Sequence, residues 1–188
     1  MSLLSEPAVR VGVTVTFLRM EAPPADVAAL PSGVAVHRVR DCGVAEYRSY
    51  YDGVGAPYLW WLRRTMSDRQ LAALLRDSNV SIHRLDIDGK VSGFYELDAT
   101  NWPAVNLSYF GLMPHAVGRG LGYAFLCDAV SRAWRQGPRA VTVNTCTADH
   151  PRAMPNYLRA GFVPVREVFE TWNIPTRLGL RIPKALQV

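Results

Sequence analysis

The first third of the chain mixes short apolar stretches with polar and helix-breaking residues. Val13–Leu18 alternates with a period of two and predicts a strand, and Val34–Val39 predicts a second, shorter strand. Residues 22–31 contain several Pro and Ala residues and predict a loop or a short helix. Asp41–Tyr50 is compatible with a helix, which the Gly and Pro residues at 53–57 would end.

A helix and a run of three strands follow in the middle of the chain. Ser67 and Gln70 form a capping-box pattern before leucines at helical spacing, which predicts a helix from about Asp68 to Asp77. Three segments then alternate with a period of two and predict strands: Val80–Ile87, Lys90–Asp98 and Val105–Leu112. Because Asp88-Gly89 is a tight-hairpin signal, we expect these strands to form an antiparallel meander.

The last third of the chain alternates helices and strands. Gly120–Trp134 is the strongest helical pattern, because apolar residues recur every four positions from Leu121 to Ala133. The remaining expected elements are a strand at Val141–Cys146, a helix at Pro151–Arg159, a strand at Val163–Trp172 and a C-terminal arm at 173–188. This order predicts a mixed α+β layered domain and differs from the regular alternation of a doubly wound fold.

Length and composition place the chain among globular proteins. Its 188 residues fit one domain, and 49% hydrophobic with 20% charged residues is a globular balance. No apolar run approaches the ~20 residues of a membrane span. The amino-terminal segment has an early acidic residue, so we expect no secretory signal. Three widely spaced cysteines lack metal-ligand spacing. We therefore expect a cytoplasmic protein with free thiols, no metal and no membrane partner.

The net charge of +5 is compatible with several polyanionic partners. The basic residues are Arg except for Lys90 and Lys184, and Arg binds carboxylates and phosphates through a two-point fork. The arginines are scattered and form no basic tail, so we expect no nucleic-acid partner. A nucleic-acid-binding protein stays an alternative that salt-dependent binding to duplex DNA or RNA would support.

Glycines cluster immediately before the strongest helix. Gly118, Gly120 and Gly122 allow a tight turn and a close approach of a ligand to the backbone. The unpaired N–H groups at the start of a helix form an anion site, to which Arg119 could add a charged contact. The loop has neither the Rossmann spacing nor the Lys of a P-loop. On these residues alone, a phosphate site and a plain glycine-rich turn stay equally open.

A second segment, downstream of the next predicted strand, changes this balance. The loop reads Val117-Gly118-Arg119-Gly120-Leu121-Gly122, and the later segment reads His150-x-x-Ala153-x-x-x-Tyr157-x-x-x-Gly161-Phe162. In this order and separation, the two motifs resemble those of the GNAT superfamily of acyl-CoA-dependent N-acyltransferases over about residues 80–165. Two positions depart from the family pattern, because Val117 replaces a Gln or Arg and His150 replaces an Asn.

The resemblance implies a fold and a cofactor. The fold would be α+β, in three α/β layers, with a mixed and mostly antiparallel sheet of six to seven strands and helices on both faces. The sheet would open between the strand ending at Leu112 and the strand starting at Val141, and acetyl-CoA would enter this opening. The implied cofactor-binding residues are Leu112, Met113, Val117, Gly118, Arg119, Gly120, Leu121, Gly122, His150 and Ala153.

The resemblance also implies a direct attack of an amine on the thioester. Tyr157 matches the family tyrosine near the sulfur, and we assign it as general acid, with a core tyrosine as the alternative. The position of the carboxylate in histone-modifying members is Asn106, which cannot act as a base. Glu96 is our candidate for the base or an acceptor anchor. Asp98, His83 and a water chain are the other options.

The acceptor pocket is expected between the early helices. Tyr58, Trp60 and Trp61 lie in an aromatic segment that would either bind the acceptor or cover the core. Cys146 ends a predicted strand and is expected to be a packed thiol rather than a nucleophile. His115 and His150 lack a third ligand at metal-binding spacing.

The motifs lead to one main functional hypothesis and one rival. We expect an enzyme that moves an acetyl group from acetyl-CoA to a primary amine of a small molecule or to another exposed amine. The rival is a non-catalytic acyl-CoA-binding sensor or regulatory module of the same fold, which Asn106 favours and Tyr157 disfavours. A homodimer is compatible with the sequence.

Overall fold

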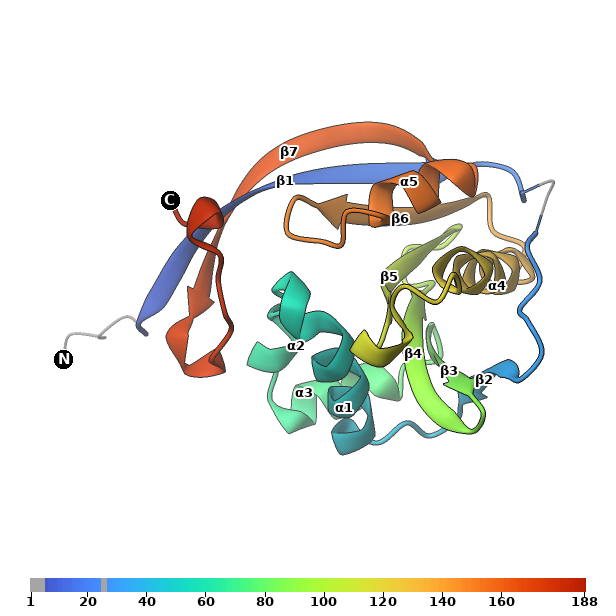
Figure 1. The fold of residues 1–188 in the computed structure, drawn as a ribbon, viewed down its shortest axis with the longest axis horizontal. Coiled ribbons are helices and arrows are strands. Elements are labelled where there is room, and N and C mark those ends of the chain that lie inside the picture. Colours follow the sequence, from blue (N-terminus) through green and yellow to red (C-terminus); the bar gives the residue numbers. More distant parts are fainter. Residues whose placement is uncertain (1–5, 25–26) are drawn as a thin grey trace.

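In residues 6–24 and 27–188, which the computed structural model describes, seven strands form one sheet in the order β2-β3-β4-β5-β6-β1-β7 (Figure 1). The neighbours β5 and β6 are parallel, and the other neighbouring pairs are antiparallel. The predicted mixed and mostly antiparallel sheet is therefore confirmed. The strands are β1 (Ala8–Met20), β2 (Val34–Val39), β3 (Val80–Ile87), β4 (Lys90–Asp98), β5 (Ala104–Leu112), β6 (Ala140–Cys146) and β7 (Val163–Pro175).

Helices cover both faces of the sheet, as predicted. On one face, α1 (Val44–Gly55) and α3 (Asp68–Leu75) share an apolar cluster with the β-strand residues Ile82 and Phe94. On the other face, α4 (Gly122–Trp134) and α5 (Ala153–Arg159) share a larger cluster with Leu97 and Val105. A short helix, α2 (Leu62–Thr65), precedes α3 and was not predicted. Both layers bury one apolar stripe of each helix, which is why the helical periodicity could be read from the sequence.

The predicted meander and its first turn are present. Strands β3 and β4 are joined by Asp88 and Gly89, which have φ values of 49° and 78°. Positive φ at both central residues is the geometry of the hairpin turn that Asp-Gly favours. The predicted capping box also forms, because the Gln70 N–H donates to the Ser67 hydroxyl while the Gln70 side chain accepts from the Ser67 N–H.

The first strand does not lie at the edge of the sheet beside the next strand in sequence. Instead, β1 lies between β6 and β7 and is antiparallel to both (Figure 1). Its register with β7 runs from Ala8 opposite Pro175 to Arg19 opposite Val163. This long pairing explains why both strands exceed their predicted limits: the partner extends the ladder of backbone hydrogen bonds beyond the residues with a clear alternating pattern.

The predicted end of the first helix was wrong, because α1 continues through Gly53 and Gly55. A side chain at position 53 would meet Met113 Sδ at 2.6 Å, and one at position 55 would meet Trp60 at 2.5 Å. These glycines therefore permit close packing inside a helix rather than ending it. In the opposite sense, α4 starts at Gly122 rather than at the expected Gly120, because Gly120 has a φ of 77°, outside the right-handed helical region.

The C-terminal arm folds back onto the sheet. Beyond β7, Gln187 pairs with Val11, and the Val188 N–H donates to the Arg10 carbonyl at 3.1 Å. Leu178, Leu180, Ile182 and Leu186 pack in one apolar cluster with Val11, Val13 and Val15 of β1. The described part of the predicted loop or short helix at 22–31 contains neither helix nor strand. Residues 1–5 and 25–26 lie outside the described residues. The expectation that the amino-terminal segment is no secretory signal falls partly on the first of these ranges. Within the described chain, no helix is long and apolar enough to cross a membrane.

Candidate active site

A cavity lies where strands β5 and β6 part. The two strands pair only from Ala104 opposite Ala140 to Leu107 opposite Val143, and both continue beyond that point without pairing to each other. A side-chain bond from Thr142 Oγ1 to Asn106 Oδ1, 3.0 Å long, joins them just before they separate. The cavity has a volume of about 750 Å³ and reaches from the glycine loop to the aromatic segment before α2. A cleft of this volume suits a cofactor-sized ligand.

The glycine loop forms one wall of the cavity. Gly118 and Gly120 have φ values of 83° and 77°, and a side chain added at either would meet nothing within 4 Å. These glycines therefore provide a positive φ rather than room for a packed neighbour, and the space beside them is open. Helix α4 begins immediately after the loop. Such a loop at a helix N-terminus presents backbone N–H groups and the positive end of the helix dipole to an anion.

The structure does not bring all of the predicted cofactor residues to the cavity. Val117, Gly118, Gly120, Leu121, Gly122, Leu112, His150 and Ala153 line it, whereas Arg119 and Met113 do not. Arg119 is exposed, and the positive charge at this wall comes from Arg152 and Arg159 instead. The Met113 N–H donates to the Ser92 carbonyl at 2.8 Å, so it has a partner inside the protein.

Tyr157 lies on α5 and lines the cavity, although only 6% of its surface is exposed. Its ring packs edge-on against Phe162 with 5.9 Å between centroids. Burial, and then the negative charge of Asp149, raise the pKa of the Tyr157 hydroxyl. The hydroxyl is therefore protonated at neutral pH, which is the state required of a proton donor.

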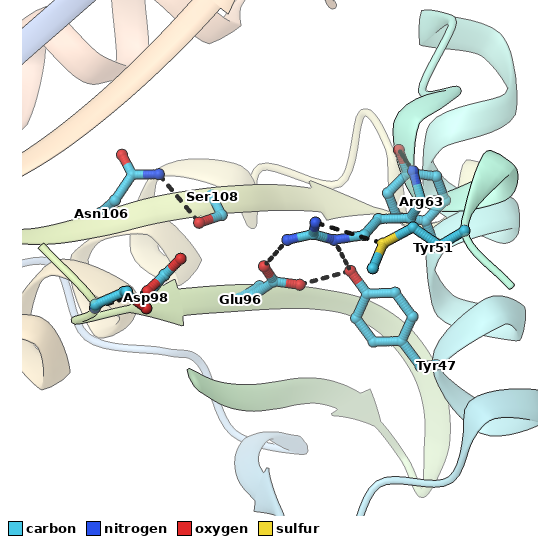
Figure 2. A network of polar contacts seen from close by, with 9 residues as sticks. Tyr47, Tyr51, Arg63, Glu96, Asp98, Asn106 and Ser108 are labelled. Atoms are coloured by element: carbon cyan, nitrogen blue, oxygen red, sulfur yellow. Dashed lines mark hydrogen bonds and ion pairs between the residues drawn. The ribbon is translucent and has the colours of Figure 1, made fainter. Parts of the chain in front are cut away.

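Glu96 is fully buried and does not line the cavity. Figure 2 shows that both of its oxygens are engaged: Arg63 Nη2 lies 2.7 Å from Oε1, and the Tyr47 hydroxyl donates to Oε2 at 2.5 Å. Arg63 itself lines the cavity, with its guanidinium 5.2 Å from the centre of the Tyr109 ring. Glu96 therefore reaches the cavity through Arg63 and has no free oxygen directed at an acceptor.

The other base candidates on these strands lie outside the cavity lining as well. Asp98 accepts the Thr100 N–H at 2.8 Å. His83 stacks on Tyr95 with 4.7 Å between centroids, and burial together with Arg132 lowers its pKa to about 4. His83 is thus a neutral ring within the packed layer beneath α4 at physiological pH.

The predicted aromatic segment lies at the cavity, and part of it packs against the core. Tyr58, Trp60 and Trp61 all line the cavity. Trp60 also packs against Tyr51 and Tyr109, with ring centroids 5.3 and 5.0 Å apart. Trp60 and Trp61 therefore pack against the apolar clusters and form a cavity wall at the same time, whereas Tyr58 contributes to the wall.

Asp149 is the cavity residue that sequence reasoning missed. Its Oδ2 accepts the Thr145 hydroxyl at 2.7 Å and the Cys146 N–H at 2.9 Å, and its carboxyl also bonds the side chain of Trp60. Burial raises the pKa of this carboxyl above its ordinary value. The only signal in the sequence was a single acidic residue between a predicted strand end and a predicted helix, which is also common in ordinary turns.

Cys146 and His150 line the cavity on either side of Asp149 in the sequence. Burial, and then Asp149, raise the pKa of the Cys146 thiol to about 12, so it is no nucleophile at neutral pH. His150 Nδ1 accepts the Arg152 N–H at 3.1 Å, and its ring lies edge-on to Tyr58. Among the residues that the structure describes, no three His, Cys, Asp or Glu side chains gather as a metal site would require.

No protein-family model and no curated protein matches the chain. Solved structures do match it. A GCN5-related N-acetyltransferase from Sphaerobacter thermophilus has a TM-score of 0.60 at 19% identity and covers 90% of this chain. A tandem GNAT protein from the clavulanic acid biosynthesis pathway has a TM-score of 0.62 at 21% identity and covers 92% of this chain. This chain has the GNAT fold.

The GNAT fold is shared with shorter and longer proteins. The chain spans 53% and 61% of the lengths of the two structures just named. An aminoglycoside acetyltransferase from an uncultured soil metagenomic sample, with a TM-score of 0.56 at 13% identity, is covered over 88% of its length by 69% of this chain. At these identities the likeness concerns the fold, so the chemistry of this GNAT-fold protein has to be argued from its own residues.

Proposed function

We propose that the protein is an N-acyltransferase that transfers an acetyl group from acetyl-CoA to a primary amine. The observation that carries this proposal is the continuity of one cavity, which links the open glycine loop, the unpaired edges of β5 and β6 and the buried Tyr157. The GNAT fold supports acyl transfer, and one of the similar structures is described as being without AcCoA. The acceptor is a small molecule or another exposed amine.

The cavity residues fit the parts of an acyl-CoA. The loop from Val117 to Gly122 offers backbone N–H groups for the pyrophosphate, with Arg152 and Arg159 nearby as cations. Within the described residues, no strand pairs with β5 on the β6 side from Ser108 to Leu112, so its backbone groups there fit the amides of a pantetheine arm. Acyl-CoA supplies an activated thioester carbonyl.

Proton transfer to the leaving sulfur is assigned to Tyr157. The amine nitrogen bonds to the carbonyl carbon, the carbon–sulfur bond breaks, and the Tyr157 hydroxyl gives its proton to the sulfur. The nitrogen loses one proton as the amide forms, and the Tyr157 phenolate takes this proton up readily because the pKa of the hydroxyl is raised. We assign Glu96 a positioning role, since it holds Arg63 against the cavity wall and does not meet the acceptor directly.

The proposal predicts binding of acetyl-CoA and release of CoA with amines. Calorimetry measures the first, and a thiol reagent measures the second. Tyr157→Phe should lower kcat by about 10²–10⁴-fold, the usual contribution of a positioned acid, while acetyl-CoA affinity stays near that of the native protein. Tyr50→Phe is the matched control, because Tyr50 is a buried tyrosine of α1 outside the cavity lining.

Two results separate the rivals. Acetyl-CoA binding without CoA release from any amine would support the sensor, which the Asn106 side chain at the strand position favours. Failure to bind acetyl-CoA would refute both readings of the cavity.

A further inference from the structure

The cavity contains a half-buried carboxylate without a cation beside it. Asp149 contacts a hydroxyl, a backbone N–H, an indole and the Cys146 thiol. Among the ion pairs of the described residues, none involves Asp149. Glu96 differs, because Arg63 compensates its charge. A charge that is partly withdrawn from water and has no counter-charge is costly, so a cation would stabilise the Asp149 carboxylate.

The surroundings of Asp149 define what kind of cation fits. Trp60 donates a side-chain bond to it, and burial, followed by the charge of Asp149, raises the pKa of the Tyr58 hydroxyl. Trp61 and Trp172 line the same cavity. Aromatic faces attract ammonium groups and bury apolar bodies. The second acidic residue of the lining, Glu170, accepts the Trp172 indole N–H at 2.8 Å.

Asp149 also lies near the group that we assign as acid. Its charge raises the pKa of Tyr157, and both side chains line one cavity. The positive side chains Arg152 and Arg159 lie at the N-cap and at the last residue of α5, and they line the cavity together with the glycine loop. The third arginine of the lining, Arg63, lies at the aromatic end and is paired with Glu96. The arginines outside the ion pairs of the described residues thus accompany the predicted phosphate end, and Asp149 accompanies the aromatic end.

We infer that Asp149 is a catalytic residue that binds the ammonium group of the acceptor and takes its proton, and that the acceptor is a primary amine on an aromatic or apolar body. This inference rests on the proposed function. The ammonium gives one proton to the Asp149 carboxylate, which later returns it to water. The nitrogen then bonds to the thioester carbon, the sulfur leaves with the Tyr157 proton, and the second nitrogen proton restores the tyrosine.

The first test needs no variant. Acetyl transfer is measured for phenethylamine, for phenylalanine, which carries the same ring with a carboxylate, and for an aminoglycoside. We expect kcat/KM for phenethylamine to exceed that for phenylalanine by about tenfold or more, because a second negative charge would face Asp149. Equal or better use of phenylalanine or the aminoglycoside would overturn the inferred acceptor class.

The second test separates catalysis from the turn that Asp149 closes. Asp149→Asn keeps an oxygen for the Thr145 and Cys146 bonds but removes the charge and the base. With phenethylamine, kcat/KM should fall by about 10²–10⁴-fold. An aryl alkoxyamine, which is neutral at pH 7 and needs no deprotonation, should lose less than about tenfold. Equal losses for the two nucleophiles would show a structural role only.

A control and a binding measurement complete the design. Asp77→Asn is the matched variant, because Asp77 accepts the Asn79 N–H at 2.9 Å in a turn outside the cavity lining. Its kinetics should equal those of the native protein. Calorimetry with acetyl-CoA shows which of the two proposals fails. If the native protein does not bind acetyl-CoA, the proposed function is refuted. If it binds acetyl-CoA and acetylates the amine, but Asp149→Asn changes neither kinetic constant, only this inference is refuted.

Discussion

The buried group formed by Arg63, Glu96 and Tyr47 gives a prediction that separates a positioning residue from a base. Glu96 is 0% exposed and accepts bonds at 2.7 Å from Arg63 and 2.5 Å from Tyr47 (Figure 2). Glu96→Gln preserves the shape and leaves the Arg63 charge without its counter-charge. Removing one partner of a buried ion pair costs about 3–5 kcal/mol. Because Arg63 keeps 19% of its side chain exposed, we expect the lower end of this range, about 3 kcal/mol.

This loss should be visible by two assays. For a chain of this size, about 3 kcal/mol corresponds to a decrease in Tm of roughly 6–12 °C. Urea unfolding should give a lower midpoint at an unchanged slope. Tyr47→Phe should cost about 1.5–3 kcal/mol, the worth of one bond to a charged group. Adding Arg63→Gln to Glu96→Gln should restore part of the stability, because the double variant holds no unpaired charge.

Kinetics decide between the two roles for Glu96. A positioning role predicts a higher acceptor KM and a kcat within about tenfold of the native value, once the variant is assayed below its Tm. The reasoning would be refuted by a Glu96→Gln protein of native stability whose kcat falls by about 100-fold or more, since that pattern belongs to a base.

Two further predictions concern the walls of the cavity. Gly120→Val places a side chain on a backbone with a φ of 77°, so calorimetry should show an acetyl-CoA affinity lowered by about tenfold or more. Gly89→Val, at a φ of 78° in the β3–β4 hairpin, is the control and should lower stability by a similar amount without changing this affinity. Cys146, with its pKa raised to about 12, should hold a thiolate in only about 1 molecule in 10⁴ at pH 8, so iodoacetamide should label it slowly until urea unfolds the chain; rapid labelling of the folded protein would contradict the burial of this thiol.

Local patterns predicted most of the elements because each pattern records which side of an element is buried. The strand limits of β2, β3 and β4 agree with the structure, and so does the buried row of α4. The pattern gave a wrong helix end where glycines are present for close packing rather than for an unusual backbone conformation. Gly53 and Gly55 looked like helix breakers, but they make room for Met113 and Trp60, which lie elsewhere in the chain.

The two glycine- and tyrosine-containing motifs predicted the cofactor wall for a similar reason. Gly118 and Gly120 need positive φ, and few other residues tolerate it, so the loop is visible in the sequence. Acidic residues carry no such restriction. The interpretation of Glu96 as a base depends on its strand next to Asn106 and on alternation, and the structure pairs it with Arg63 outside the cavity lining. Asp149 resembled an ordinary turn residue until the fold placed it beside Tyr58, Trp60 and Tyr157.

The sequence by itself determined the succession of helices and strands, the glycine loop and the tyrosine of α5, because each depends on residues a few positions apart. Only the tertiary structure decided that β1 lies between β6 and β7, where Thr14 meets Thr147 across 133 positions of sequence. It also decided that Asp149 lines the cavity, whereas Glu96 lies outside the lining and is paired with Arg63. Both outcomes depend on contacts between distant segments, and the free energy of such contacts leaves no periodic trace in either segment alone.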